Sequence, residues 1–309
     1  MTNTRIIFAG TPEFALASLR ALLESGTVPV AVLTQPDRPA GRGKRLKASP
    51  VKEYALAHDI DVLQPESLRD DDIVAQLTAL QADIMIVAAY GLLLPQRVLD
   101  IPRAGCLNVH ASLLPRWRGA APVQAAILAA DEDTGVCLMS MTAGLDCGPV
   151  FVSETLEIGV DENAGELHDR LAAAGGTLLV EYLADIIDSR ISAAEQNEAA
   201  ATYAHKIRTS DAKIDWQRPA SELVRVVRAF NPVPGAHFML DDERIKCWQA
   251  AEAVADDSPA GTVIDAGPDG VVVVCGQGAL RLIELQRPGK RPVSAAQFVS
   301  NIDIVGRQL

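Results

Sequence analysis

The chain has 309 residues, 49% of them hydrophobic and 22% charged, which is ordinary for a globular protein of about two domains. No apolar run reaches the roughly 18 residues of a membrane-spanning helix, and the N-terminus has neither a signal nor a transit pattern, so we expect a cytoplasmic protein. The net charge of −12 argues against general affinity for nucleic acid.

Strand and helix patterns alternate over the first 189 residues. Short apolar runs predict strands, and apolar residues at helical spacing predict helices. The expected strands cover residues 5–10, 28–33, 62–63, 83–89, 106–110, 135–142 and 150–158, and the expected helices cover 12–25, 50–57, 70–80, 96–99, 120–130 and 164–188. This order predicts an α/β domain with a Rossmann-like, open and mostly parallel sheet over residues 1–189.

The first strand ends at Gly10, where many nucleotide-binding folds have a glycine-rich turn. Gly10 stands alone, without the G-x-G-x-x-G fingerprint of dinucleotide sites and without a P-loop. Thr11 and Pro12 instead fit the N-cap and the first residue of a helix, and Ser49 and Pro50 fit the same roles in the next helix. We therefore predict a Rossmann-like sheet that binds neither NAD nor ATP.

A basic segment interrupts the acidic first half of the chain. Residues 206–309 hold 13 basic and 13 acidic side chains, so the whole net charge lies in residues 1–205. Residues 35–47 are too rich in Pro, Gly and charge for a regular element, and they predict a long exposed loop at the end of a strand. A basic loop on an acidic domain favours a local contact with an anionic partner. The basic residues between 35 and 52 are Arg38, Arg42, Lys44, Arg45, Lys47 and Lys52.

The C-terminal third has a different pattern. Residues 190–205 lose the apolar periodicity and predict a linker. A helix over 221–230 then opens a second domain, 206–309, in which short strands alternate with glycine-containing turns. The expected strands are 236–240, 245–248, 262–264, 271–275 and 280–285. This spacing predicts a small β-barrel of the oligonucleotide-binding type.

Two polar side chains leave the strand at 106–110 together. Asn108 and His110 are two residues apart, so both side chains lie on one face of the strand, close to its carboxyl end. Ligands of open α/β sheets bind at that end. Taken alone, an Asn-x-His pair is more often a buried histidine beside a turn-forming asparagine. Asp146 lies in a loop with two glycines and a proline, 143–149, which can place its carboxylate at close range.

The polar set of Asn108, His110 and Asp146 comes without a distinct Ser or Cys nucleophile. The five cysteines are odd in number, lack a C-x-x-C pair and have no histidines at metal-ligand spacing, so we expect reduced, buried thiols and no metal. Such a set suits acyl transfer between two substrates. An amide and an imidazole stabilise the oxyanion, and a carboxylate holds the imidazole tautomer or relays protons.

The motifs around these residues resemble those of the folate-dependent formyltransferases. The resemblance covers essentially the whole chain, and the Asn-His-Asp set matches completely. Features at both ends, Phe8–Phe14 and Asn231–Ala236, together with the basic segment, are most similar to the members that act on initiator methionyl-tRNA. The central motifs are Asn108-x-His110-x-Ser112-Leu113-Leu114-Pro115, Arg118-Gly119 and Gly144-Leu145-Asp146-x-Gly148.

This resemblance implies a donor, an acceptor and roles for the site residues. The donor is 10-formyltetrahydrofolate, which leaves as tetrahydrofolate, and the acceptor is the α-amine of methionine on initiator tRNA. Asn108 and His110 would polarise the formyl oxygen, and Asp146 would support proton transfer. We expect a monomer, with the second domain also contacting tRNA. The residues implied for folate are Tyr90, Ser112, Leu113, Leu114 and Pro115, and those implied for tRNA are Arg42, Lys44, Arg45 and Lys47.

Other acceptors and functions remain open from the residues alone. A folate enzyme that formylates glycinamide ribonucleotide would use the same three side chains, but it needs neither the basic segment nor the second domain. A formyltetrahydrofolate hydrolase module and a sugar-nucleotide formyltransferase would be accompanied by domains that we do not find here. A non-catalytic RNA-binding protein is disfavoured by the intact Asn-His-Asp set.

Overall fold

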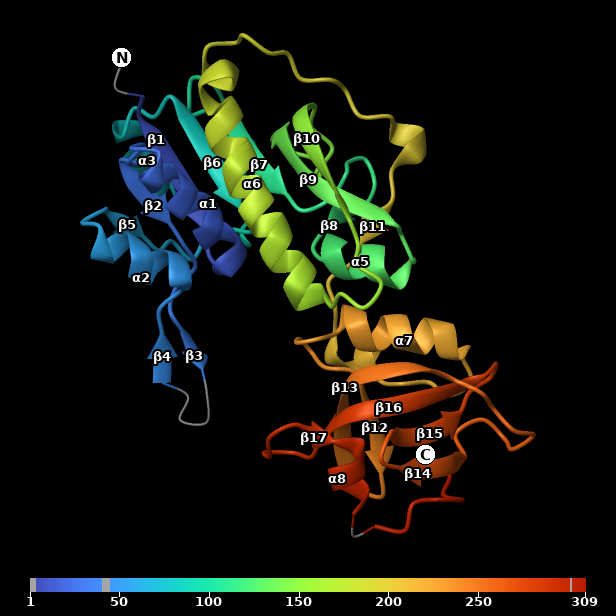
Figure 1. The fold of residues 1–309 in the computed structure, drawn as a ribbon. Helices are drawn as coiled ribbons and strands as arrows, with labels where there is room; N and C mark the ends of the chain where they lie inside the picture. The colour runs from blue at the N-terminus through green and yellow to red at the C-terminus, as the bar shows by residue number, and fades with distance from the viewer. Residues whose placement is uncertain (1–3, 41–44, 301) are drawn as a thin grey trace. The chain divides into compact units, whose positions relative to one another are not determined.

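The computed structural model describes residues 4–40, 45–300 and 302–309, in which the chain divides into two compact units (Figure 1). Each unit draws on more than one stretch of sequence. The first unit contains Met1–Pro122, Asp133–Glu157 and His168–Ala204, and the second contains Val123–Glu132, Ile158–Leu167 and His205–Leu309. No helix in the described ranges combines the length and the hydropathy that a membrane span requires.

The first unit is built on a seven-stranded sheet with the order β10-β9-β7-β6-β1-β2-β5. Neighbouring strands are parallel from β5 to β7, and β9 and β10 are added antiparallel. The expected Rossmann-like, mostly parallel sheet is thus confirmed. The strands are β1 (Ile6–Gly10), β2 (Ala31–Leu33), β5 (Val62–Leu63), β6 (Ile84–Ala88), β7 (Cys106–His110), β9 (Asp133–Ser140) and β10 (Val150–Glu157).

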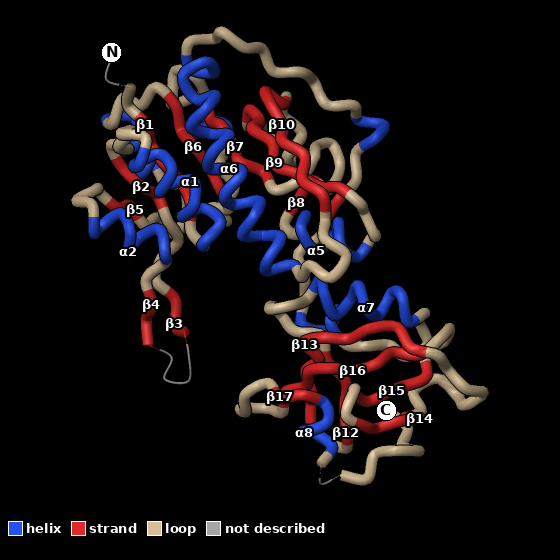
Figure 2. The backbone as a smooth tube through the Cα atoms, viewed as in Figure 1, coloured by secondary structure: helices blue, strands red, loops and turns tan. Residues whose placement is uncertain are grey.

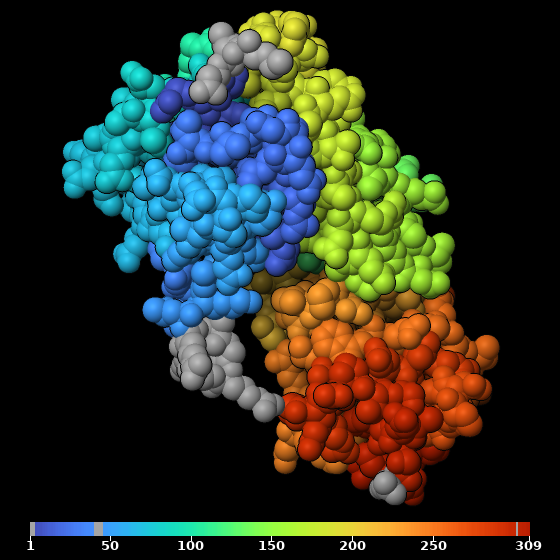
Figure 3. All heavy atoms as spheres, turned by 60° about the vertical axis from the view of Figure 1, so that its left-hand side comes forward, coloured from blue at the N-terminus to red at the C-terminus, as the bar shows by residue number. Residues whose placement is uncertain are grey.

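Helices cover both faces of this sheet. On one face α6 lies close to β7, and a Cβ atom on Gly175 would approach a methyl of Val109 to 2.8 Å. On the same face α6 packs against α1, and the two helices lie side by side in the space-filling view (yellow and dark blue, Figure 3). The opposite face packs against α3 and α4. The helices up to this point of the chain are α1 (Glu13–Glu24), α2 (Pro50–Ala57), α3 (Asp71–Ala79), α4 (Gln96–Leu99), α5 (Pro122–Leu128) and α6 (Ala164–Ile187). Of these, α5 belongs to the second unit from Val123 onward.

The starts of the first two helices show where local sequence signals hold and where they fail. Ser49 is the N-cap of α2, as expected, and its hydroxyl accepts a hydrogen bond from the amide of Lys52 at 3.0 Å. Thr11 does not cap α1, whose N-cap is Pro12. The Thr11 hydroxyl instead donates to the carbonyl of Tyr90 at 3.0 Å, so a tertiary contact replaces the expected local one.

The solitary Gly10 has a packing reason. A Cβ atom there would lie 2.5 Å from Cβ of Ala15 and 3.0 Å from the carbonyl oxygen of Ala88. The end of β1 is thus pressed between the first turn of α1 and β6, and only glycine fits. This contact accounts for the glycine without a phosphate-binding turn.

The basic segment is more regular than expected. β3 (Arg38–Ala40) and β4 (Arg45–Lys47) form an antiparallel hairpin, which corrects the prediction that no element forms within residues 35–47. The hairpin was not predicted because Pro39 and the charged side chains lower the strand propensity of this segment. Two strands of three residues tolerate a proline where they have no further neighbour.

The second unit contains an antiparallel sheet with the order β12-β13-β16-β15-β14, and β17 pairs with β16 (red in Figure 2). The five strands expected from the sequence are present, whereas β17 and α8 were not predicted. A core that includes Trp216 and Phe238 lies between this sheet and α7. The elements are η2 (Thr209–Ala212), α7 (Ala220–Ala229), β12 (His237–Leu240), β13 (Glu243–Ala253), β14 (Val263–Gly267), β15 (Gly270–Val274), β16 (Ala279–Gln286), β17 (Val293–Ser294) and α8 (Ala295–Val299).

The expected linker, 190–205, is not a free tether. It contains a short 3-10 helix, η1 (Glu198–Ala200), and the strand β11 (Tyr203–Ala204). β11 pairs in parallel with β8 (Arg118–Gly119), so residues up to Ala204 belong to the first unit. The segment has no apolar periodicity because main-chain and polar side-chain bonds hold it in place.

Candidate functional site

Asn108 and His110 leave the carboxyl end of β7 on the same face of the sheet. The parallel register aligns Met85 of β6 with Cys106 and Val87 with Asn108, so both polar side chains share the face that packs on α3 and α4. Both are nearly enclosed, with exposed fractions of 8% for Asn108 and 6% for His110. The amide and the imidazole therefore lie at the sheet edge where open α/β folds bind ligands.

The main chain after β7 selects the imidazole tautomer. Nε2 of His110 lies 3.2 Å from the carbonyl oxygen of Trp117. Because a carbonyl only accepts, Nε2 carries the hydrogen. Trp117 has a φ of +62°, a conformation that non-glycine residues seldom adopt, and its carbonyl lies within reach of the imidazole. Nδ1 is left as the nitrogen that can exchange a proton with a partner.

That partner is Asp146. Its Oδ2 atom lies 3.9 Å from Nδ1 of His110, within ion-pair range but beyond hydrogen-bond range. The same oxygen accepts a hydrogen bond of 2.8 Å from the amide of Gly119. Asp146 has a φ of +47°, in the left-handed region that non-glycine residues seldom adopt. The structure thus brings His110 and Asp146 together across 36 positions of sequence.

The residues expected to contact folate follow the neighbouring strands β6 and β7. Ser112 is fully buried, and its hydroxyl donates to the carbonyl of Arg116 at 2.7 Å, so it shapes the turn that carries Leu113 to Pro115. The hydroxyl of Tyr90 is buried without a hydrogen-bond partner among the described residues. Burial raises the pKa of this phenol well above its ordinary value. Tyr90 follows β6, the strand beside β7.

The four residues expected to contact tRNA are only partly described. Arg42 and Lys44 lie outside the described residues, and Arg45 is described by its main chain in β4. The side chain of Lys47 is exposed. The structure therefore describes the base of the basic segment and, of the four side chains expected to contact tRNA, only that of Lys47.

Asp37 anchors that base. Its carboxylate accepts hydrogen bonds from Nζ of Lys52 at 2.8 and 2.9 Å and from the side-chain amide of Gln64 at 2.8 Å. The bond from Lys52, with that from Gln64, holds the pKa of Asp37 below its usual value. The hairpin thus begins from an acidic residue that is tied to α2 and to the end of β5.

Several residues of the site were not identified individually from the sequence. Trp117 and Gly119 contribute main-chain atoms, which no side-chain pattern reveals. Arg118 lay within the recognised motif, but its partners lie about 80 positions away, at Gln196 and Glu198. Those two partners fall in the segment that was expected to be a linker. Gln196 and Glu198 reach the site through tertiary contacts, which no local sequence pattern predicts.

Four of the five cysteines are buried, as expected, whereas Cys147, beside Asp146, is partly exposed. All five cysteines are free. Burial raises the pKa of Cys106 to about 12 and that of Cys137 to about 11, so both are protonated at neutral pH. Among the described residues, no group of three His, Cys, Asp or Glu side chains is arranged to hold a metal ion.

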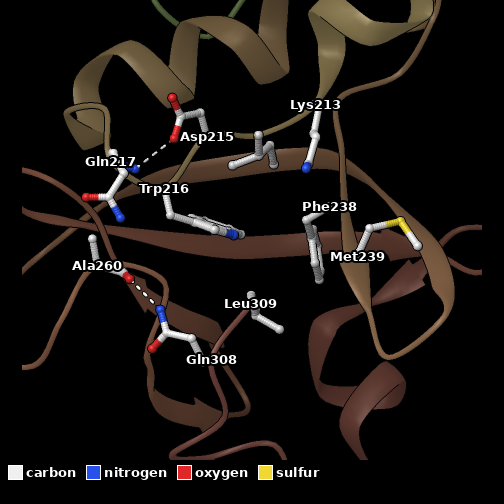
Figure 4. A pocket seen from close by; sticks show the side chains of 10 residues that line it. Lys213, Asp215, Trp216, Gln217, Phe238, Met239, Ala260, Gln308 and Leu309 are labelled. Carbon is white, nitrogen blue, oxygen red and sulfur yellow. Dashed lines mark hydrogen bonds between the residues drawn. The ribbon is translucent and has the colours of Figure 1, made fainter.

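A separate cavity of about 440 Å³ lies within the second unit. The indole of Trp216 and the ring of Phe238 line it, and Lys213 and Met239 come from neighbouring segments (Figure 4). None of the side chains expected to act on substrate lines this cavity. We therefore place the candidate active site at the end of β7 in the first unit.

Comparison with known families matches both parts of the chain. Residues 4–183 match the formyl transferase family, and residues 206–302 match the formyl transferase C-terminal domain family. A methionyl-tRNA formyltransferase from Pseudomonas syringae pv. syringae (strain B728a) is 52% identical over 94% of this chain and 92% of its own length. A methionyl-tRNA formyltransferase from Pseudomonas putida (strain GB-1) is 53% identical over 96% of each chain.

Solved structures share the fold at low sequence identity. An N-formyltransferase from Helicobacter canadensis, in complex with folinic acid and dTDP-3-aminofucose, is 17% identical, with a TM-score of 0.66 over 92% of this chain and 99% of its own. HypX from Aquifex aeolicus, in complex with tetrahydrofolic acid, is 16% identical, with a TM-score of 0.64 over 100% of this chain and 49% of its own. The chain therefore belongs to the formyl transferase family, within its methionyl-tRNA formyltransferase group.

Proposed function

We propose that the protein transfers the formyl group of 10-formyltetrahydrofolate to the α-amine of methionyl-initiator tRNA. The product is N-formylmethionyl-tRNA, which serves translation initiation, and the donor leaves as tetrahydrofolate. The observation that carries this proposal is the His110–Asp146 pair, 3.9 Å apart beside Asn108, in a chain about half identical to methionyl-tRNA formyltransferases. Glycinamide ribonucleotide remains the alternative acceptor to be tested.

In the transfer, the amine nitrogen bonds to the formyl carbon, and negative charge develops on the formyl oxygen. The amide of Asn108 donates a hydrogen bond to this oxygen. His110 assists when Nδ1 is protonated, because Nε2 is already committed to the carbonyl of Trp117. Removing one such donor typically lowers the rate by about 10²–10³-fold. The two side chains thus supply the electrostatic part of catalysis.

Asp146 acts as the general acid–base group of the reaction. The attacking amine must lose a proton as the new C–N bond forms, and the departing nitrogen of the donor must gain one. Oδ2 of Asp146 remains close to Nδ1 of His110 without a direct hydrogen bond, so the carboxylate is available to take a proton from the amine. A free α-amino group has a pKa of about 7.7–8.0, and the ester lowers it, so little deprotonation is required.

The folate site is formed by the turn at 112–116 and the turn after β6. Ala89 and Gly91, on either side of Tyr90, have φ angles of +42° and +86°. The chain therefore turns sharply as soon as β6 ends. The side chain of Tyr90 is enclosed in the apolar cluster on this face of the sheet, so the turn offers the donor its main-chain groups. These residues bind and orient the donor.

The basic hairpin contacts tRNA. Arg42 is the residue expected to enter the acceptor stem, and Lys44, Arg45 and Lys47 are expected to meet phosphates. The Asp37–Lys52 bond, 2.8 Å long, fixes the start of the hairpin. Contacts from Lys and Arg to phosphates place the RNA without reading its sequence, so selection of the initiator rests on Arg42.

A formyl-transfer assay tests the proposal. The purified protein is mixed with labelled 10-formyltetrahydrofolate and offered methionyl-initiator tRNA, elongator methionyl-tRNA or glycinamide ribonucleotide. We expect label on the initiator tRNA, with little on the elongator tRNA. Label on glycinamide ribonucleotide alone would retain the chemistry of His110 and Asp146 but overturn the tRNA assignment. Absence of label on every acceptor would overturn the activity itself.

A further inference from the structure

Residues 196–204, here named the strap, lie against the loops that carry the candidate catalytic groups. Trp117 and Arg118 are bonded to the same strap residue: the amide of Trp117 donates to the Thr202 hydroxyl at 2.9 Å, and the amide of Arg118 to the Thr202 carbonyl at 2.9 Å. The amide of Ala120 donates to the carbonyl of Ala204, also at 2.9 Å. The strap thus fixes the stretch that supplies the Trp117 carbonyl to His110 and the Gly119 amide to Asp146.

Gln196 holds the main chain on both sides of the Asp146 side chain. Its Nε2 atom donates to the carbonyl of Asp146 at 2.8 Å and to the carbonyl of Gly148 at 2.7 Å. Asp146 has a left-handed φ of +47°. A conformation of this kind costs about 1–3 kcal/mol and persists where the surroundings determine it. The two bonds from Gln196 are such a determinant.

Gln196 is itself held by Arg118. The guanidinium Nε of Arg118 donates to Oε1 of Gln196 at 3.0 Å, which fixes the orientation of the amide. The two terminal nitrogens of Arg118 donate to the carboxylate of Glu198 at 2.8 and 2.9 Å. Arg118 is 1% exposed, although Glu198 lies at the surface. The bond from Arg118 lowers the pKa of Glu198, so the pair is charged at neutral pH.

Arg118 and Gly119 are adjacent, which closes the network around Asp146. The carboxylate of Asp146 is held by the amide of Gly119, and its main chain is held through Gln196 by the side chain of Arg118. We propose that Gln196 and Arg118 are positioning residues, which set the Asp146 carboxylate opposite His110. This inference rests on the proposed function and adds residues of the expected linker to its active site.

Substitution of Gln196 provides the test. Gln196→Met keeps the length of the side chain and removes every polar contact. Gln196→Glu keeps an acceptor for Arg118 but turns an oxygen toward the two carbonyls. Because a displacement of the order of 1 Å at a reacting group can lower the rate about 10²-fold, we expect both variants to lose about 10²-fold in kcat, with KM for the folate nearly unchanged. Glu195→Gln, an exposed neighbour, is the matched control.

A double-mutant cycle shows whether Gln196 acts through Asp146. Gln196→Met is measured in the native chain and in Asp146→Asn, under single-turnover conditions. If Gln196 acts only by placing the carboxylate, its substitution costs little once that carboxylate is gone, because residues that act as a unit are not additive. The same loss in both backgrounds would overturn the proposal, and so would near-native kcat in Gln196→Met.

The outcomes also separate this proposal from the proposed function. If the native chain formylates no acceptor, the proposed function fails before any variant is compared. If the native chain is active and Gln196→Met equals Glu195→Gln, only the positioning role fails. Thermal melting of each variant identifies general unfolding, which would change the folate KM and the melting temperature together with kcat.

Discussion

Nδ1 of His110 and Oδ2 of Asp146 face each other at 3.9 Å, while the opposite nitrogen of the imidazole is bonded to the carbonyl of Trp117. In many catalytic pairs the carboxylate fixes the tautomer of the histidine. Here a main-chain carbonyl does so, and the carboxylate is bonded to the amide of Gly119. This division leaves Asp146 free to move a proton, and it separates the expected effects of substitutions at the two residues.

Asp146→Asn is expected to lower kcat strongly without loss of binding. The asparagine retains an oxygen for the Gly119 amide, so the loop keeps its anchor and only the proton-accepting carboxylate is lost. General acid–base catalysis contributes about 10²–10⁴-fold, and we expect a loss in that range at constant KM for tRNA. Steady-state kinetics with varied tRNA measures it. Turnover near the native rate would remove Asp146 from the mechanism.

His110→Ala and Asn108→Ala are each expected to lower kcat by about 10²–10³-fold, the usual cost of one oxyanion donor. Both side chains are nearly enclosed, so a cavity at either position affects stability too. Asn108→Asp, which keeps the volume but replaces the amide donor by an acceptor, should therefore be as slow as Asn108→Ala. Melting curves separate the two effects. An active Asn108→Asp variant would contradict the donor role.

One half of the candidate site was predictable because Asn108 and His110 are close in sequence. Asn108 and His110 share one strand, so their common face follows from the period of two. Asp146 lies in a loop whose two glycines and proline indicate that its carboxylate can approach a site closely, but the sequence does not show that it meets His110. The fold was predictable for a similar reason, since β1, β6 and β7 are short apolar runs that are buried throughout.

The rest depends on contacts that the sequence does not display. Gln196 and Asp146 are 50 positions apart, and nothing in the composition of the strap distinguishes a bonding glutamine from a solvated one. Thr11 has the residue type and the position of an N-cap, yet its hydroxyl donates a hydrogen bond to the carbonyl of Tyr90, 79 positions away. In both cases a polar side chain satisfies a distant main-chain group, and local propensity has no information about such a partner.

Lys47→Ala is expected to weaken tRNA binding in a salt-dependent manner. Lys47 is exposed on β4, and a single phosphate contact of this kind makes the dependence of log K on log salt shallower by about 1. Titration of binding against salt concentration measures the slope. Arg190→Ala is the control, because that guanidinium is already paired with Asp185 and Asp188. An equal change in slope for both variants would remove Lys47 from the interface.

Asp37→Asn is expected to remove the part of the pH dependence of the melting temperature that comes from the base of the hairpin. The pKa of Asp37 is lowered in the folded state by Lys52 and Gln64, so its bonds contribute stability above the unfolded pKa of about 3.9. That contribution is lost as the pH falls through the folded-state pKa. The native chain should therefore melt higher than the variant near neutral pH, and the difference should vanish in acid. A difference independent of pH would indicate that the charge of Asp37 plays no part.

Gly119→Ala is expected to damage both stability and turnover. Gly119 has a φ of +117°, and an added Cβ would lie 2.6 Å from the carbonyl oxygen of Ala204. Strain of this kind costs about 1–3 kcal/mol, and relieving it means moving β11 away from β8. The amide that holds Asp146 would then shift, so kcat should fall together with the melting temperature.

The control for this substitution is Gly267→Ala. Gly267 has no positive φ, and a Cβ there meets no atom within 4 Å, so this variant adds a methyl group without strain. We expect it to match the native chain in melting temperature and in kcat. If Gly119→Ala melts lower but keeps the native kcat, the β8–β11 pairing stabilises the fold without setting the carboxylate of Asp146. If both quantities fall only for Gly119→Ala, the strap and the active site depend on the same contact.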